Sequence, residues 1–330
     1  MIRNKMKIGS FNIRSRIVMP PVATYQSTAD GKVTEQMIRY YKERAANSNV
    51  GMIITEHSYI SLQGKAKEKQ LSVSSDDDIE GLTRLTEEIH KNGVAAMAQL
   101  NHAGSAALTS ATGMKAVSAS NVILPTDPVM GDGIEPDVLS KDEIQKVISD
   151  FAAAAGRAKK AGYDGVEIHS AHAYLLNQFY SPLTNKRTDE YGGSLDNRLR
   201  IHREVIRAVR NEVGEDYTIA VRLGGCDYMD GGSTIEDSVY AARVLEEEGV
   251  DLIDVSGGMC RYILKGHDEP GYFREMSMAI KNAVKIPVLL TGGIKILADA
   301  DALLNEGAAD LIGVGRELLK DAKWEVCNVL

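Results

Sequence analysis

Three short apolar runs, DLIDVSGG (251–258), VLLTGG (288–293) and DLIGVGR (310–316), decide the fold. Each is apolar on successive residues instead of alternating with polar ones, which is typical of a strand buried on both faces of a parallel sheet. The stretches that separate the runs are long enough for crossover helices. The three runs therefore predict neighbouring parallel strands.

Five further runs have the same character and alternate with helical patterns. They cover residues 16–22, 50–57, 94–102, 165–169 and 218–224. Between them, the capping box Ser140-Lys-Asp-Glu143 predicts the start of a long helix that ends at Gly162. Eight strands alternating with helices predict an α/β protein, with a single (β/α)8 TIM barrel as one domain over residues 1–330. A doubly wound sheet is the alternative, but no G-x-G-x-x-G follows the first strand.

Two segments fall outside a minimal barrel. Residues 6–13 predict a short N-terminal hairpin around Gly9 and Ser10, covering the N-terminal end of the barrel. Residues 105–140 form a long connection after the third strand, with three glycines and three prolines between residues 113 and 136. A loop this long inside one domain is usually functional, so it predicts a lid over a site at the C-terminal end of the barrel.

Composition and charge exclude several classes of protein. The 330 residues hold 38 Lys and Arg against 46 Asp and Glu, a net charge of −8 that argues against nucleic-acid binding and a membrane surface. No apolar run approaches the ~18 residues of a membrane span, and the first residues have no apolar signal-peptide core. Cys226, Cys260 and Cys327 lie far apart, which excludes a disulfide scaffold and a self-contained zinc or iron–sulfur site. A cytoplasmic protein is expected.

Glycines after the last two strands predict a phosphate site. Gly292 with Gly293, and Gly315 in the next loop, would bring backbone N–H groups close to a phosphate, and Arg316 adds a forked cation. The alternative is that these glycines only make tight turns. Two such loops side by side, with an arginine in the second, favour a phosphorylated ligand.

His169 and His172, after the fourth strand, have three interpretations. An H-x-x-H pair can bind zinc, but no third soft ligand stands at an obvious strand end, and Glu167 is expected to point away from His169. A purely structural role is the second interpretation. The third, which we favour, is a pair of donors that hold a carbonyl or carboxylate oxygen, with Tyr174 as proton donor. No metal site is predicted.

Arg222 stands near the end of the fifth strand and needs an anion. It could form a core ion pair with Glu167 or Glu56. The alternative is the anionic edge of a cofactor, for which a fixed guanidinium is well suited.

Four stretches of the sequence can be compared with known protein families. They are RIVMPPVATY (16–25), QLNHAG (99–104), VEIHSAHAYLLNQFYSPLTNKRTDEYGGSLDNRLR (166–200) and ADLIGVGRELLKD (309–321). On these motifs the chain resembles the Old Yellow Enzyme family of flavin-dependent ene-reductases, and more closely its bacterial NADH:flavin oxidoreductases. The resemblance runs from about residue 8 to residue 324. The third motif is long and highly specific.

The resemblance implies FMN bound noncovalently across the C-terminal end of the barrel, with NADH or NADPH as hydride donor. Carried over position by position, it implies cofactor contacts from Pro20, Pro21, Val22, Ala23, His57 (main chain), Gln99, Arg222 (at flavin N1 and O2), Gly258, Gly292, Gly293, Gly315 and Arg316. His169 and His172 match the pair that grips the substrate's activating oxygen. Tyr174 matches the proton donor, and Tyr25 an additional substrate-contacting tyrosine.

The implied reaction is reduction of the C=C bond of α,β-unsaturated carbonyl compounds, with hydride from flavin N5 and a proton from Tyr174. One alternative is a flavin reductase acting mainly on quinones, nitro compounds or oxygen. The other is a flavin-free phosphate-binding barrel that acts as a lyase or isomerase.

Some positions depart from the family pattern. Ala23 stands where relatives carry cysteine or threonine. The sequence after the sixth strand, SGGMCRY (256–262), lacks the histidine of dienoyl-CoA reductases. Neither the cysteine cluster nor the nucleotide-binding C-terminal domain of larger relatives is expected, so electrons would come directly from the nicotinamide. The sequence leaves open the physiological substrate, the choice of NADH or NADPH, and whether the chain forms a homo-oligomer.

Overall fold

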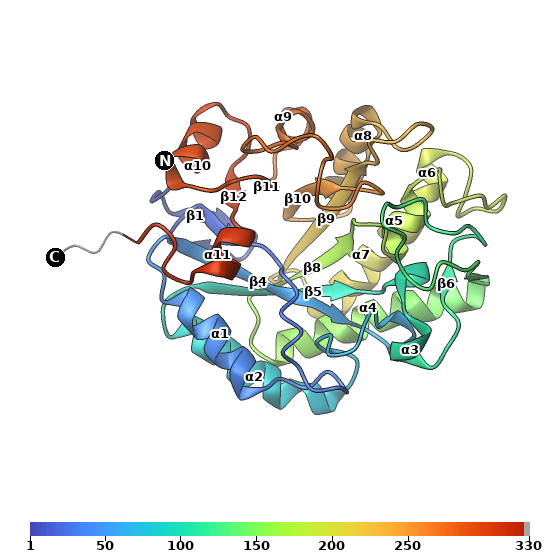
Figure 1. Cartoon of the computed structure of the whole chain (residues 1–330), viewed down its shortest axis with the longest axis horizontal. Helices are drawn as coiled ribbons and strands as arrows, with labels where there is room; N and C mark the ends of the chain where they lie inside the picture. The colour runs from blue at the N-terminus through green and yellow to red at the C-terminus, as the bar shows by residue number, and fades with distance from the viewer. Residues whose placement is uncertain (327–330) are drawn as a thin grey trace.

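Eight parallel strands close into a barrel in the computed structural model, which describes residues 1–326 (Figure 1). In ring order these are β10 (Leu252–Gly257), β11 (Val288–Thr291), β12 (Leu311–Gly313), β3 (Ile17–Met19), β4 (Val50–Tyr59), β5 (Ala95–Asn101), β8 (Gly165–Ser170) and β9 (Thr218–Cys226), which pairs again with β10. The (β/α)8 barrel predicted from the apolar runs is confirmed.

The first and last strands are shorter than predicted. β3 ends at Met19 because Pro20 and Pro21 have no N–H to donate to the ladder, so the chain leaves the sheet there. β12 ends at Gly313, and the helix that follows begins at Arg316. Both shortened strands leave their following residues as loops at the C-terminal end of the barrel.

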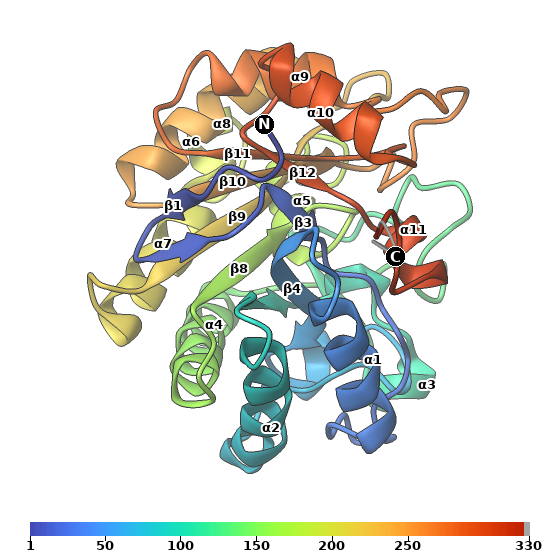
Figure 2. The same ribbon diagram turned by 90° about the vertical axis from the view of Figure 1, so that its left-hand side faces the viewer.

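Helices cover the outside of the barrel. After successive strands come α1 (Glu35–Ala45), α2 (Ile79–His90), α4 (Lys141–Lys160), α7 (Arg200–Val213), α8 (Ile235–Glu247), α9 (Arg274–Lys281), α10 (Leu297–Asn305) and α11 (Arg316–Lys320). Figure 2 shows α1, α2 and α4 side by side around the strands. Ser140 and Glu143 form the predicted capping box at the start of α4.

The N-terminal hairpin closes one end of the barrel. Its strands β1 (Met6–Ile8) and β2 (Phe11–Ile13) are antiparallel, and the backbone N–H of Ser10 donates to Thr218 Oγ1 at 3.0 Å. Ile8 and Ile13 are buried in an apolar cluster, which we call the N-terminal plug, made of Ile8, Ile13, Val18, Met52, Ile54, Met97, Ala220, Leu252, Leu289 and Leu311. The predicted cover of this end is confirmed.

The long connection of residues 105–140 is partly structured. It contains α3 (Thr109–Thr112) and two short parallel strands, β6 (Val117–Ser118) and β7 (Asp137–Val138). Its residues Ala106 and Leu124 share a small apolar cluster with Ala173, and Met130 and Tyr174 pack at the edge of this cluster. The connection is therefore anchored beside Tyr174, and its role as a lid stays a prediction.

Candidate active site

Four polar side chains from neighbouring strands lie close together inside the barrel. Neighbouring strands pair Gln99 with Glu167 and Asp254 with Arg222 in register. Gln99 Nε2 donates to Glu167 Oε1 at 2.8 Å, and Arg222 Nε lies 3.1 Å from Asp254 Oδ2 in a poorly aligned ion pair. The protein partner of Arg222 is thus Asp254, so the alternative of a core ion pair with Glu167 or Glu56 named the wrong acid.

Glu167 and His169 are two residues apart on β8, so both side chains point to the same side of the strand. The expectation that Glu167 points away from His169 was therefore wrong. Burial and the charge of Asp254 raise the pKa of Glu167 well above its usual value, whereas burial, opposed by Arg222, raises the pKa of Asp254 to about 6. The two neighbouring carboxyl groups thus oppose each other's ionisation, and Asp254 is the one whose charge Arg222 favours.

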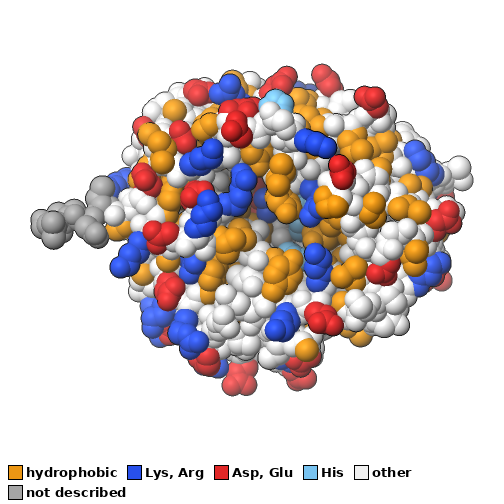
Figure 3. All heavy atoms as spheres, viewed as in Figure 1, with side chains coloured by type: hydrophobic (Ala, Val, Ile, Leu, Met, Phe, Trp, Pro, Cys, Tyr) orange, Lys and Arg blue, Asp and Glu red, His pale blue; other side chains and the backbone are white. Residues whose placement is uncertain are grey.

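The predicted catalytic side chains lie together at the C-terminal mouth of the barrel. The ring centroids of His169 and His172 are 4.9 Å apart, and those of His169 and Tyr174 are 5.0 Å apart, both in edge-to-face contact. The ring of His57 lies 5.6 Å from that of Tyr174. Figure 3 shows a central hollow on the face viewed in Figure 1, with histidine inside it and Lys and Arg side chains around it.

Both histidines are neutral donors. Burial lowers the pKa of each well below its usual value, and nearby positive charges, including that of Arg222, lower it further. The backbone N–H of Ala171 donates to His169 Nδ1 at 3.3 Å, which assigns the ring proton to Nε2. His172 Nε2 lies 2.8 Å from Ser256 Oγ; when Ser256 donates, the proton of His172 is on Nδ1. Each ring then has one N–H to offer a ligand.

The backbone is strained around this cluster. His172, Ala173, Tyr25 and Arg261 have φ values of 60°, 62°, 55° and 65°, in the left-handed region that residues other than glycine seldom adopt. Such residues cost on the order of 1–3 kcal/mol each and gather at functional sites. Tyr25, predicted to contact substrate, is 46% exposed at this mouth.

The segment that follows β3 meets the last loop of the barrel. Pro20, Pro21, Val22 and Ala23 are partly or fully buried here, and a Cβ added to Gly315 would lie 3.5 Å from Pro20 and 3.6 Å from Val22. The predicted flavin-lining segment and part of the predicted phosphate site are therefore adjacent.

Glu56 and His57 support this segment from the end of β4. Thr24 donates its hydroxyl to Glu56 Oε2 at 2.5 Å, and burial raises the pKa of Glu56 to about 7. Gln70 Nε2 donates to His57 Nδ1 at 2.7 Å and reaches the His57 carbonyl oxygen at 3.2 Å. The main chain of His57 is predicted to contact the cofactor, and its carbonyl already accepts this one hydrogen bond.

The glycine turn after β11 has the properties of an anion site. Gly292 and Gly293 are buried with φ values of 143° and 69°, and their N–H groups, like that of Gly315, donate to no other residue among those described. Buried N–H groups without a partner are rare, because each costs free energy unless a ligand satisfies it. Arg316 is exposed. Burial raises the pKa of Tyr272, whose ring covers Gly292, and the positive charge of Arg316 is close enough to counteract this rise. This donor set fits a phosphate group.

Close packing at the ends of β9 and β10 requires glycine at position 258, whether or not this residue contacts a cofactor. The N–H of Gly258 donates to the carbonyl of Cys226 at 2.9 Å, and a Cβ there would lie 2.2 Å from Asp227 Oδ1. Any larger residue would push apart the ends of β9 and β10.

A family model described as the NADH:flavin oxidoreductase / NADH oxidase family matches residues 4–327. The chain belongs to this family. Membership implies FMN as the cofactor and NADH or NADPH as its electron donor. The residues at the mouth fit that cofactor, since the guanidinium of Arg222 suits the anionic edge of a flavin and the unpartnered N–H groups suit its phosphate.

Proteins from several bacteria are similar to this chain. It is 39% identical to an NADH oxidase of Thermoanaerobacter brockii over 96% of this chain, but spans only 49% of that protein's length. It is 38% identical to an NADPH dehydrogenase of Halalkalibacterium halodurans, covering 94% of this chain and 89% of that one. The structure of an old yellow enzyme homologue from Zymomonas mobilis superposes with a TM-score of 0.84 at 29% identity, over 97% of this chain and 90% of that one.

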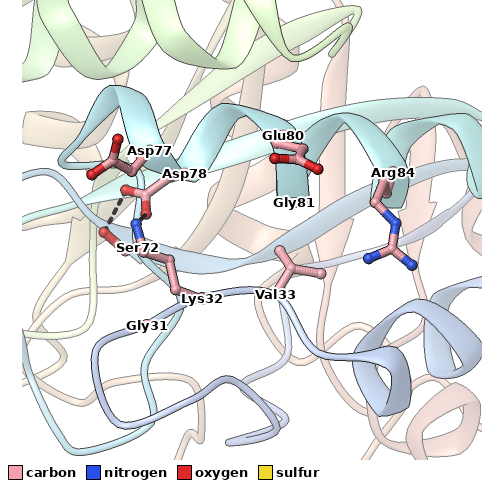
Figure 4. Close-up of a pocket in the computed structure, with 9 residues that line it drawn as sticks. All are labelled: Gly31, Lys32, Val33, Ser72, Asp77, Asp78, Glu80, Gly81 and Arg84. Carbon is pink, nitrogen blue, oxygen red and sulfur yellow. Dashed lines mark hydrogen bonds and ion pairs between the residues drawn. The ribbon is translucent and has the colours of Figure 1, made fainter.

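Other surface features are unlike a catalytic site. A cavity of about 130 Å³ lies between α2 and residues 31–33. Its lining includes Lys32 and Ser72 around Asp78 (Figure 4). Lys32 Nζ is 2.6 Å from Asp78 Oδ1, and Ser72 donates to Asp78 Oδ2. Because Asp78 is already paired twice, we assign this cavity a structural role. Residues 1–326 hold no group of three or more His, Cys, Asp or Glu arranged to bind a metal. No helix within the same range has the length and apolarity to cross a membrane.

Proposed function

We propose that this protein reduces the C=C bond of α,β-unsaturated carbonyl compounds, using FMN at the mouth of the barrel and electrons from NADH or NADPH. The observation that carries the proposal is the edge-to-face cluster of His169, His172 and Tyr174 at that mouth. Bound FMN would supply the hydride that the β-carbon of the substrate accepts. The protein's own side chains supply binding, orientation and the proton.

His169 and His172 bind the carbonyl oxygen of the substrate. As neutral rings, each with one N–H directed to a ligand, they draw electron density from the conjugated double bond. Their hydrogen bonds strengthen as negative charge develops on that oxygen, so they favour the transition state over the ground state. Ser256 fixes the orientation of His172 through the 2.8 Å hydrogen bond.

Tyr174 donates the proton to the α-carbon. Burial raises the pKa of its phenol above the usual value, so the hydroxyl stays protonated at neutral pH. Tyr174 as a whole is only partly buried, and its ring lies 5.0 Å from that of His169, beside the groups proposed to bind substrate. A phenol in that position is a proton donor that does not compete as a base.

Arg222 and Gln99 would hold the pyrimidine edge of FMN, and Gly292, Gly293, Gly315 and Arg316 its phosphate. Pro20, Pro21, Val22 and Ala23 would line the ring system, with a main-chain contact from His57. The charge of Arg222 is only partly neutralised by Asp254, because their contact is poorly aligned. The remaining positive charge suits a cofactor that becomes anionic on reduction.

Anaerobic stopped-flow spectroscopy tests the proposal. Protein loaded with FMN is reduced with NADH or NADPH and then mixed with 2-cyclohexenone, menadione or oxygen. We expect the enone to reoxidise the flavin faster than buffer alone, at a rate that rises with enone concentration. Reoxidation by the enone at the buffer rate would overturn the proposal.

A second candidate is a flavin reductase whose main acceptor is oxygen, a quinone or a nitro compound. The name NADH oxidase of the Thermoanaerobacter brockii relative favours it. Faster reoxidation by oxygen or menadione than by any enone in the same experiment would support this second candidate.

A further inference from the structure

The loop that follows β10 places a cation beside the candidate substrate site. Gly257 and Gly258 begin a tight turn in which the N–H of Arg261 donates to the Gly258 carbonyl at 2.9 Å. A Cβ at Gly257 would lie 2.1 Å from the Arg261 carbonyl oxygen, so the turn can close only over glycine. The turn therefore holds Arg261 in a defined place, with its own φ at 65°.

Arg261 lies next to the side chains proposed to bind substrate. Its guanidinium carbon is 5.2 Å from the ring centroid of Tyr262, and that ring is 5.8 Å from the ring of His172. Its positive charge acts on His172, Tyr174 and Tyr25. Tyr272 donates its hydroxyl to the carbonyl of Tyr262 at 2.6 Å, which fixes the loop from the other side.

Apart from the ring of Tyr262, this cation has no partner among residues 1–326. Arg261 Nε is buried without a hydrogen bond, and no carboxylate in that range lies within ion-pair distance of the guanidinium. Glu56, the acid that acts on neighbouring Tyr25, is occupied by hydrogen bonds from Thr24 and Tyr41. A partly buried arginine without an anion is costly, so its place at a ligand site indicates an anionic ligand.

We propose that Arg261 binds a carboxylate of the substrate, so that the preferred substrates are α,β-unsaturated carbonyl compounds that also carry a carboxylate. This inference rests on the proposed function, because the carbonyl oxygen of the same molecule is held by His169 and His172. The planar guanidinium pairs with a carboxylate through two parallel hydrogen bonds, which fixes the orientation of the double bond as well as adding affinity.

Binding of inert ligands tests the site without turnover. Oxidised protein loaded with FMN is titrated with 4-hydroxybenzoate and with its uncharged methyl ester, and the flavin absorbance reports each Kd. We expect the acid to bind more tightly than the ester. Arg261→Gln should weaken the acid roughly 10- to 100-fold and the ester less than 2-fold. Arg261→Lys should retain part of the preference, and Arg274→Gln, a matched arginine on α9 near Glu306, should retain all of it.

Turnover tests the substrate class. The reduced protein is mixed with 4-oxopent-2-enoate or its methyl ester, and Arg261→Gln should lower the second-order rate constant for the acid alone by a similar factor. Equal affinity for acid and ester in the unaltered protein would overturn the role of Arg261 while leaving the proposed function intact. Weaker binding of NADH and NADPH in Arg261→Gln, with hydroxybenzoate unchanged, would also overturn it and assign the cation to a phosphate of the donor. Arginine-dependent binding of the acid without reoxidation by either enone would support the anion site and contradict the proposed function.

Discussion

The two ends of the barrel are built on opposite principles. The N-terminal plug is apolar, and the hairpin strands β1 and β2 seal it with Ile8 and Ile13. The C-terminal mouth holds the buried side chains of His169 and His172 and the buried acids Glu167 and Asp254 near Arg222. It also holds four non-glycine residues with positive φ, as described above. The plug therefore supplies stability, whereas the mouth gives up stability to hold polar groups in place.

The largest expected effect is loss of turnover at the mouth without loss of stability. Changing both His169 and His172 to alanine removes two donors, and each is worth about 10²–10³ in rate. Enone-dependent reoxidation in the stopped-flow experiment should fall at least 10³-fold. Reduction by NAD(P)H and FMN content should persist.

His90→Ala is the matched control for this double variant, because His90 pairs with Asp164 on the outer surface. It should leave turnover unchanged. Loss of FMN from the double variant would contradict the assignment and place the pair in contact with the cofactor instead.

Acid should destabilise the protein through its buried histidines. Burial lowers the pKa of His57 to about 4, of His102 to about 3 and of His202 to about 4. Because these folded-state values lie below the ordinary value of 6.5, their stabilising contribution is present above pH 6.5 and is lost as the pH falls toward 4. Each should remove on the order of 2 kcal/mol from the free energy of unfolding between pH 7 and pH 5.

Urea unfolding of the unaltered protein and of His202→Gln measures this effect, and the variant should lose less stability between pH 7 and pH 5. Glu56 acts in the opposite direction. Its pKa is raised to about 7, so its contribution is present below pH 4.5 and lost as the pH rises through 7. If His202→Gln lost as much stability as the unaltered protein between pH 7 and pH 5, protonation of the His202 ring would not be a cause of the acid effect.

The plug should show the reverse pattern, with stability lost and turnover kept. Ile13→Ala leaves a cavity in the apolar cluster, which typically costs about 2–5 kcal/mol. Urea unfolding measures the loss, and enone turnover at 25 °C should stay within 2-fold, roughly the limit for a change that leaves the site intact. Ile296→Ala, at a residue 45% exposed, is the control and should cost little. A large fall in turnover for Ile13→Ala would show that the two ends are coupled.

The smallest expected effect concerns the cofactor's phosphate. Arg316→Ala removes one charged donor from the glycine turn and should raise the Kd for FMN about 10-fold, with little change in unfolding. Flavin fluorescence on titration of the cofactor-free protein measures this. Lys320→Ala, on the same helix α11 and paired with Glu317, should leave the Kd unchanged. An unaltered Kd for Arg316→Ala would remove this residue from the phosphate site.

Much of the architecture follows from local patterns. Consecutive apolar residues predicted the parallel strands, and the capping box predicted the start of α4. Strand ends were less predictable, because Pro20 and Pro21 stop β3 by removing donors from the ladder.

A motif that holds residues close in sequence made the grouping of His169, His172 and Tyr174 predictable. Asp254 and Ser256 were missed, although two polar residues at alternate positions of a buried strand could have revealed them. The position of Arg261 depends on a turn that closes after β10, and no local pattern specifies which side chain that turn brings beside His172.

The order of strands around the barrel places the predicted phosphate site and the proposed substrate-binding histidines on different sides of its C-terminal end. β8, which carries His169, stands diametrically opposite β12, which precedes Gly315 and Arg316. The neighbouring strands β11, β12 and β3 contribute the glycine turn and the proline segment as one continuous arc, while β8 and β10 hold the groups proposed to meet substrate. Because the loop after β8 and the arc that holds the phosphate are separate stretches of polypeptide on a shared scaffold, the range of molecules transformed can diversify by changes in that loop while the hold on the cofactor's phosphate stays untouched.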